Sequence, residues 1–199
     1  MSDKQHAPAT LRNREPIAEV LARELPASGT VLEIAAGTGE HAMFFADRFP
    51  ALHWQPTDPS PEALASIAAY QAEYPGTNCA APLLLDAAMP ETWPVTSAAA
   101  ILCINMVHIS PWEATVGLFR SAAQVLGNSA GALILYGPFM EQGIETAASN
   151  REFDASLKAR DARWGLRDAE ALDRLAAEHD MARSARYALP ANNIMLIYR

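Results

Sequence analysis

The sequence predicts an α/β fold in which a mostly parallel sheet of seven strands carries helices on both faces and ends in an antiparallel hairpin. Three observations predict it. A strand, a glycine-rich turn and a helix follow one another over residues 30–50. Strand-like apolar runs then alternate with helical patterns, which is typical of parallel sheets with right-handed crossovers. The last two strand-like runs are joined by residues 190–192 alone, which favours an antiparallel pair.

Length and composition predict one globular domain that spans residues 1–199. Half of the 199 residues are hydrophobic, which suffices for one sizeable core. The formal net charge of −8 argues against a nucleic-acid partner. We see no signal peptide and no apolar run of about 18 residues, so we expect a cytoplasmic protein without a membrane span. Cys103 lies in an apolar run, which predicts a buried thiol and neither a disulfide nor a metal site.

The glycine-rich turn is the stretch around which the fold is organised. Val31–Ile34 is apolar and predicts a strand, Gly37 and Gly39 occupy the turn, and a helix is expected from Glu40. Glycines let the backbone approach a ligand closely. The first N–H groups of the helix should be unpaired and lie at the positive end of its dipole. This order of elements is typical of a Rossmann-like nucleotide-binding unit.

The other elements follow from apolar runs and helix caps. Residues 1–10 are polar and expected to be mobile, and a helix that Pro16 starts is expected within residues 11–26. N-cap residues and capping boxes predict further helix starts at Ser60, residues 110–113, residues 149–152 and Asp168. Further strands are expected at residues 53–58, 82–86, 99–105, 132–136, 182–189 and 193–198.

Two acids and an amide follow predicted strands, at the ends where such sheets bind ligands. Asp58 lies 21 residues after Gly37 (58 − 37 = 21), close to the spacing of about 20 at which Rossmann-like units place a ribose-binding acid. Asp86 and Asn105 end the third and fourth predicted strands. Either acid could instead be an ordinary turn residue.

The glycine turn alone does not choose the cofactor. The run from Gly37 to Ala42 also fits the dinucleotide pattern G-x-G-x-x-A. Three features argue against a dinucleotide. The charge of Glu40 at the helix start would oppose a pyrophosphate, the chain has little room for a separate catalytic domain, and the final hairpin is unlike the usual dinucleotide-binding sheet.

Glu33 and the glycine turn together resemble the first motif of class I S-adenosylmethionine-dependent methyltransferases. The acids after the second and third strands and the closing hairpin extend the resemblance. More specifically, the chain is similar to a methyltransferase-like family, domain of unknown function 938. The matching segments cover nearly the whole chain: Arg12-Asn13-Arg14, LEIAAGTGEHA, WQPTDP, LCINMVHISPW, YGPF, SNREFD, WGLRD and LPANN. The resemblance implies a Rossmann-like class I methyltransferase fold and S-adenosylmethionine as cofactor, but no particular acceptor.

The resemblance also implies which residues bind the cofactor. Glu33 would support the turn near the methionine amino group, Asp58 would hold the ribose diol, and Asp86 would face the adenine amino group. The other implied residues are Gly37 and Gly39 under the methionine and ribose, Ala87 beside Asp86, and Asn105 on the methionine side.

Candidate catalytic residues follow the fourth and fifth predicted strands. His108 is a candidate general base, because its ordinary pKa lies near neutrality. A lone histidine in an apolar context is more often a packed residue. Tyr136 could line the acceptor pocket or simply pack.

Candidate substrate-binding residues lie in two further segments. Arg12, Asn13 and Arg14 could fold over the site and bind a carboxylate of the cofactor or of the substrate, or they could form a solvated edge. Asn150 lies in residues 137–166, a segment that could form a lid or carry a surface salt network.

The sequence thus favours an S-adenosylmethionine-dependent methyltransferase that acts on a small-molecule acceptor. One alternative is a catalytically silent cofactor-binding module that serves a protein partner. A less favoured alternative is a dinucleotide-dependent oxidoreductase. The acceptor and the oligomeric state stay open.

Overall fold

The computed structural model describes residues 3–127 and 130–199. Its strands are β1 Gly29–Ile34, β2 Leu52–Asp58, β3 Leu83–Leu84, β4 Ala100–Ile104, β5 Ala132–Gly137, β6 Arg183–Leu189 and β7 Asn193–Tyr198. Its α-helices are α1 Pro8–Glu24, α2 Glu40–Arg48, α3 Pro61–Gln71, α4 Trp112–Leu126, α5 Ala148–Arg160 and α6 Ala169–Ala177. Two 3₁₀ turns, Pro90–Thr92 and Met106–His108, follow β3 and β4.

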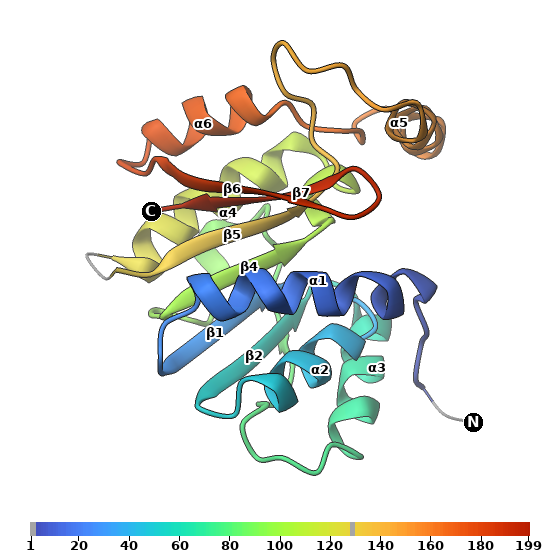
Figure 1. Ribbon diagram of the computed structural model, residues 1–199. Coiled ribbons are helices and arrows are strands. Elements are labelled where there is room, and N and C mark those ends of the chain that lie inside the picture. The colour runs from blue at the N-terminus through green and yellow to red at the C-terminus, as the bar shows by residue number, and fades with distance from the viewer. Residues whose placement is uncertain (1–2, 128–129) are drawn as a thin grey trace.

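The strands form one seven-stranded sheet in the order β3-β2-β1-β4-β5-β7-β6 (Figure 1). The pairs from β3 to β5 are parallel, and β7 runs antiparallel to β5 and to β6. The predicted parallel sheet with a closing antiparallel hairpin is therefore confirmed. The order reverses between β1 and β4, and this switch point is where open α/β sheets bind ligands.

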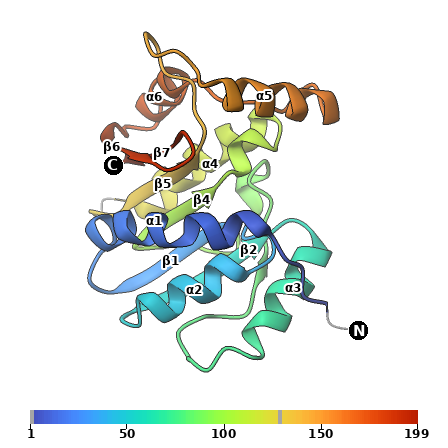
Figure 2. The ribbon, with the colours of Figure 1, turned by 45° about the vertical axis from the view of Figure 1, so that its right-hand side comes forward.

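Helices cover both faces of the sheet. α1 and α2 lie on the face toward the viewer in Figure 1, where Leu21 and Phe45 pack in one core cluster with Trp54 of β2. α4 and α6 cover the opposite face, where Phe119 packs with Tyr198 of β7. Figure 2 shows α5 outside these two layers, at the same end of the molecule as the start of α4. Burial on both faces explains why β4 and β5 are apolar throughout.

The N-terminal helix begins earlier than predicted. α1 starts at Pro8, and Pro16 lies inside the helix rather than at its start. Either proline suits a first helical turn, so the pattern alone did not separate them. Pro16 has no N–H for the carbonyl of Arg12, but the residues that follow it, Ile17 and Leu21, are fully buried. Their packing keeps the helix continuous across the proline.

Two of the four predicted helix caps are present. The side chains of Ser60 and Asp168 accept hydrogen bonds from the N–H groups three residues later. The predicted capping boxes at residues 110–113 and 149–152 are wrong. The Ser110 hydroxyl donates instead to the carbonyl of Met106, and residue 149 lies inside α5. The predicted strand at 82–86 is also shorter than expected, since β3 holds two residues.

Two absences concern the described ranges alone. Within residues 3–127 and 130–199, no helix is both long and apolar enough for a membrane span. The same ranges contain no group of three or more histidine, cysteine, aspartate or glutamate residues that could hold a metal ion. Both cysteines are free and buried, as predicted for Cys103.

Candidate functional site

Glycine stands at two positions of the turn between β1 and α2, for a different structural reason at each. Gly39 has φ +90°, and a Cβ atom there would lie 2.8 Å from the Cα of Ile67 in α3. Glycine at this position therefore allows α2 and α3 to pack closely. Gly37 has φ +58°, but a Cβ atom there would meet no atom within 4 Å. The open space above Gly37 is where a ligand could lie against bare backbone.

Three N–H groups of the turn are already paired, and the expectation of unpaired first N–H groups of the helix is therefore wrong for Glu40. Gly37 N–H donates to Oδ2 of Asp58 over 2.9 Å. Gly39 N–H donates to the carbonyl of Ala36, and Glu40 N–H donates to the Thr38 hydroxyl. No local sequence pattern indicates this self-pairing, because it depends on where the acid at the end of β2 meets the turn. These three donors are thus not free for a pyrophosphate.

Asp58 and Glu33 lie on neighbouring strands beneath this turn. The two carboxylate oxygens of Asp58 accept from Gly37 N–H and Ser60 N–H, both over 2.9 Å. Burial raises the pKa of Asp58, and these two bonds oppose the rise. Glu33 is fully buried and accepts from the indole N–H of Trp54 over 2.6 Å. Burial raises the pKa of Glu33 to about 7, the Trp54 bond opposes this, and the charge of Asp58 adds to it.

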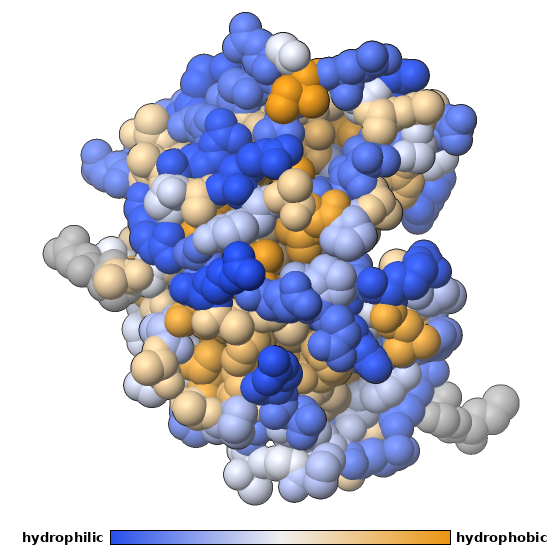
Figure 3. Space-filling model, in the orientation of Figure 1, coloured by the Kyte–Doolittle hydropathy of each residue, from blue (hydrophilic) through white to orange (hydrophobic). Residues whose placement is uncertain are grey.

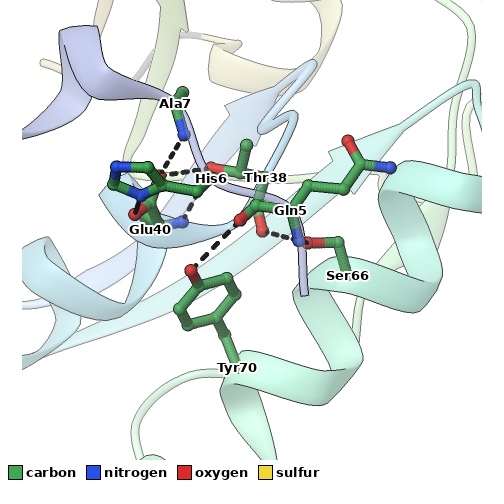
Figure 4. A network of polar contacts seen from close by, with 7 residues as sticks. All are labelled: Gln5, His6, Ala7, Thr38, Glu40, Ser66 and Tyr70. Atoms are coloured by element: carbon green, nitrogen blue, oxygen red, sulfur yellow. Dashed lines mark hydrogen bonds and ion pairs between the residues drawn. The ribbon is translucent and has the colours of Figure 1, made fainter. Parts of the chain in front are cut away.

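The N-terminal arm, residues 5–7, is bound to the turn and to α3, so the expectation of a mobile segment 1–10 is wrong for it. Figure 4 shows the network. Glu40 accepts from Ala7 N–H over 2.8 Å and lies 2.6 Å from Nδ1 of His6. The backbone of Gln5 bonds with the side chains of Ser66 and Tyr70. Burial acts against ionisation of Glu40, but bonds from Ala7, His6 and Thr38 prevail and lower its pKa.

A pocket of about 310 Å³ opens at the carboxyl ends of the central strands. Asp86 and Ala87, which follow β3, line it together with Ile34 of β1 and Met106 after β4. Pro59, next to Asp58, lines its edge. Asp86 is half-buried, and its carboxylate accepts from Ala88 N–H over 2.8 Å. At the strand ends the pocket thus combines apolar walls with the carboxylate of Asp86, a composition that suits a purine ring with an exocyclic amino group.

The segment 137–166 reaches this pocket. Asp161, Arg163 and Trp164 line the wall opposite the strand ends. The next turn contributes Arg167, whose guanidinium donates to the carbonyls of Val107 over 2.7 Å and Ser110 over 2.6 Å. Arg167 therefore holds the loop after β4 in place, a role that the sequence analysis missed. That the segment moves as a lid stays a prediction.

A second pocket of about 260 Å³ brings together three of the predicted residues. Arg12 and Asn13 of α1, Tyr136 of β5 and Asn193 of β7 line it. His41, at the start of α2, supports it from behind, because its Nε2 lies 2.8 Å from Oδ1 of Asn13. Burial lowers the pKa of His41 to about 4. The sequence analysis did not single out His41, since its pattern is that of an ordinary buried helix residue.

Asn105 lies between the two pockets. Its N–H donates to the carbonyl of Tyr136, and the next residue, Met106, lines the first pocket. Its backbone is left-handed, with φ 61°, as is that of Ala35 beside the glycine turn, with φ 55°. Left-handed backbone is costly for residues other than glycine and clusters at functional sites. The strained positions thus mark the same edge of the sheet as the pockets.

Three of the residues predicted to act in catalysis or substrate binding lie outside both pockets. His108 is fully buried against Phe139, and neither ring nitrogen has a hydrogen-bond partner within the part of the chain that the structure describes. Burial lowers its pKa to about 3, and the charge of Arg167 lowers it further. The guanidinium of Arg14 stacks on the ring of Phe44 at 4.6 Å. Asn150 donates to the carbonyl of Asn192 over 2.9 Å and lines a separate pocket beside β6.

The family of the chain is settled by sequence comparison. The model of the family described as "protein of unknown function (DUF938)" matches residues 4–199. The chain belongs to the DUF938 family. The resemblance found in the sequence is thereby confirmed.

The DUF938 fold is similar to those of solved methyltransferases. Mitomycin 7-O-methyltransferase MmcR matches with a TM-score of 0.79 and 18% identity over 96% of this chain and 54% of its own. An O-methyltransferase family 2 protein from Planctomyces limnophilus, in complex with apigenin, matches with a TM-score of 0.76 and 19% identity over 96% of this chain and 59% of its own. CalO1, a methyltransferase in calicheamicin biosynthesis in its SAH-bound form, matches with a TM-score of 0.73 and 18% identity over 92% of this chain and 54% of its own. The DUF938 chain therefore has the Rossmann-like class I methyltransferase fold and spans little more than half the length of these three proteins.

Proposed function

We propose that this protein is an S-adenosylmethionine-dependent methyltransferase that acts on a small-molecule acceptor. The observation that carries the proposal is the arrangement at the sheet edge. Asp58 ends β2 beside the bare backbone of Gly37, and Asp86 follows the neighbouring strand β3 on the wall of the 310 Å³ pocket. The fold, shared with methyltransferases that include an SAH-bound one, supports the same assignment.

The residues present fit this cofactor. Asp86 and Ala87 would hold the adenine end within the apolar pocket, and Asp58 would accept from the ribose hydroxyls. An ionised carboxylate has about four lone-pair positions, so Asp58 can hold Gly37 and Ser60 and still accept two further bonds. The open space above Gly37 leaves room for the methionine portion beside Asn105.

The same geometry disfavours a dinucleotide. A pyrophosphate needs free N–H donors and a positive helix start. Here Gly37, Gly39 and Glu40 use their N–H groups within the chain. The charges of Asp58 and Glu40 also lie beside the turn. A sulfonium ion carries positive charge, and nearby carboxylates attract it rather than repel it.

S-adenosylmethionine, when bound, supplies an activated methyl group: the acceptor's heteroatom bonds to the methyl carbon, sulfur keeps the electron pair, and the heteroatom's proton passes to water. Positioning can account for much of the acceleration, because the methyl group is already electrophilic. Tyr136, which lines the second pocket, is the residue we assign to contact the acceptor. His108 lines neither pocket, so any part it takes in catalysis would act through its neighbours.

Titration calorimetry with S-adenosylmethionine and S-adenosylhomocysteine tests the cofactor. The native protein should bind both saturably. Asp58→Asn keeps an acceptor for Gly37 N–H but removes the charge, and it should weaken binding roughly ten- to hundredfold. Asp47→Asn, at an exposed position of α2, is the matched control and should bind like the native protein.

The native protein's failure to bind at millimolar cofactor would reject the proposal, as would equal affinity of Asp58→Asn and the native chain. A screen of small hydroxy, amino and thiol compounds with radiolabelled S-adenosylmethionine then separates an enzyme from a silent binding module. Label transfer that Tyr136→Phe or Asp58→Asn reduces supports the enzyme. Cofactor binding without transfer to any acceptor favours the module.

A further inference from the structure

The pocket between α1 and the turn joining β6 to β7 has an unbalanced positive charge. Of its lining residues only Arg12 is charged. Arg12 is exposed and makes no ion pair or hydrogen bond with any residue that the structure describes. The chain as a whole carries a net charge of −8, so this cation stands out against its surroundings. Figure 3 shows the surface hollowed at its right-hand edge, between the start of α1 and α5.

A chain of hydrogen bonds fixes which polar atoms face this pocket. His41 is uncharged at neutral pH, since burial lowers its pKa to about 4. The Asn13 Oδ1 atom only accepts, so His41 Nε2 must carry the proton and donate to it. Asn13 and Tyr136 line the same pocket, and the Asn13 side chain opposes the rise that burial causes in the pKa of Tyr136. Because burial raises the pKa of Tyr136, its hydroxyl keeps a proton that it can donate.

The opposite wall is rigid. It is formed by Pro190, Ala191 and Asn193 of the hairpin turn. Ala191 and Asn192 both have left-handed backbone, with φ 58° and 57°. The amide of Asn193 donates to the carbonyls of Pro190 and Ala191, each over 3.2 Å, and so braces the turn. Because this strained and braced turn is already ordered, little entropy is lost in ordering it when a ligand binds.

We propose that this pocket binds the methyl acceptor and that the acceptor is a small carboxylate, held by Arg12 and the Tyr136 hydroxyl. A guanidinium and a phenol are both donors, and a carboxylate is a small group that accepts from both. The pocket lies next to the proposed cofactor site through Asn105, whose N–H donates to the carbonyl of Tyr136. The carboxylate is the anchor, and the heteroatom to be methylated lies elsewhere in the molecule. That the bound carboxylate is the methyl acceptor rests on the proposed function, but binding of the carboxylate is testable without turnover.

The test measures binding of propionate, benzoate and 4-hydroxyphenylacetate, each against its neutral amide, by saturation-transfer NMR on the full chain with and without S-adenosylhomocysteine. At least one carboxylate should bind in the millimolar range or tighter and its amide at least tenfold more weakly. Arg12→Gln should weaken that carboxylate roughly ten- to hundredfold, and Arg12→Lys should weaken it less. Tyr136→Phe should weaken it a few-fold. Arg23→Gln, at an exposed position near the other end of α1, is the matched control and should change nothing.

Each outcome separates this inference from the proposed function. If no carboxylate binds, or if amides bind equally well, the inference is overturned even when S-adenosylhomocysteine binds. If Arg12→Gln weakens S-adenosylhomocysteine instead of the carboxylate, Arg12 holds the cofactor's own carboxylate and the inference is again overturned. If S-adenosylhomocysteine does not bind while the carboxylate does, the methyltransferase proposal fails and a carboxylate site remains.

Discussion

Replacement of the buried acid of β1, Glu33→Gln, gives the sharpest test of the electrostatics beneath the glycine turn. Glutamine has the same shape and its side-chain oxygen can still accept from the Trp54 indole, but it cannot ionise. In the native protein burial raises the pKa of Glu33 from 4.5 to about 7. The folded state thus holds a proton on this carboxyl at pH values where the unfolded chain has released it.

The pH dependence follows from this difference. Below pH 4.5 both states are protonated, and above pH 7 both are ionised. Between these values only the folded state binds the proton, so the free energy of unfolding falls as pH rises. The interval from 4.5 to about 7, at about 1.4 kcal/mol per pH unit, corresponds to about 3 kcal/mol. Relative to the native protein, Glu33→Gln should therefore gain about 3 kcal/mol between pH 4.5 and pH 7.5.

Urea unfolding followed by far-UV circular dichroism at four pH values across this range measures the difference. Using the difference between variant and native protein cancels the other titrating groups. Glu19→Gln, at an exposed position of α1, is the control, and its curve should run parallel to that of the native protein. A Glu33→Gln curve that also runs parallel to the native one, within about 0.5 kcal/mol, would refute the reasoning.

Three further predictions rest on particular contacts. Gly39→Ala should lower the free energy of unfolding by about 2 kcal/mol or more, because its Cβ would lie 2.8 Å from Ile67. Gly37→Ala should lower the free energy of unfolding in urea by about 1 kcal/mol, yet it should abolish S-adenosylhomocysteine binding in calorimetry. Phe119→Ala should cost about 3–5 kcal/mol in the same unfolding assay, since the ring is fully buried, and a loss below 1 kcal/mol would contradict its place in the core. His108→Leu should lose less stability than the native protein as pH falls from 6.5 toward 4. With a pKa of about 3, His108 stays uncharged in the folded native protein over this range and binds a proton only on unfolding. Identical slopes of unfolding free energy against pH for the two proteins would show that the histidine is not buried uncharged.

The fold was predictable because local patterns and global topology agree in this chain. Every predicted strand occurs, and β5 and all of β4 but its last residue are buried, as their unbroken apolar runs indicate. Helix starts were less predictable. Serine at residue 110 satisfies the capping pattern, yet its hydroxyl bonds back to Met106 because a 3₁₀ turn precedes α4. Such a turn has no periodicity that a sequence pattern could reveal.

The site was predictable only where spacing along the chain sets it. Asp58 meets the turn because β1 and β2 are parallel neighbours, and that follows from their sequence order. His41 and Arg167 were missed because their partners lie on distant elements: Asn13 on α1 and the loop after β4. Contacts between segments that are far apart in sequence leave no local signal. Placement of Arg12 and Tyr136 in one pocket required the structure for the same reason.

The paired N–H groups of the glycine turn bear on how this sheet edge selects ligands. A turn with free donors attracts phosphate by charge, whatever else the ligand carries. In this chain Asp58 accepts from the N–H group of Gly37, and Glu40 is bound by His6 and Ala7 of the N-terminal arm and by the Thr38 hydroxyl. The edge therefore presents carboxylate around the turn and, one pocket further along, the cation Arg12, which has no ion-pair partner among residues 3–127 and 130–199. Two neighbouring regions of opposite charge suit a cationic cofactor and an anionic acceptor, and such a division disfavours exchange of the two ligands between their sites.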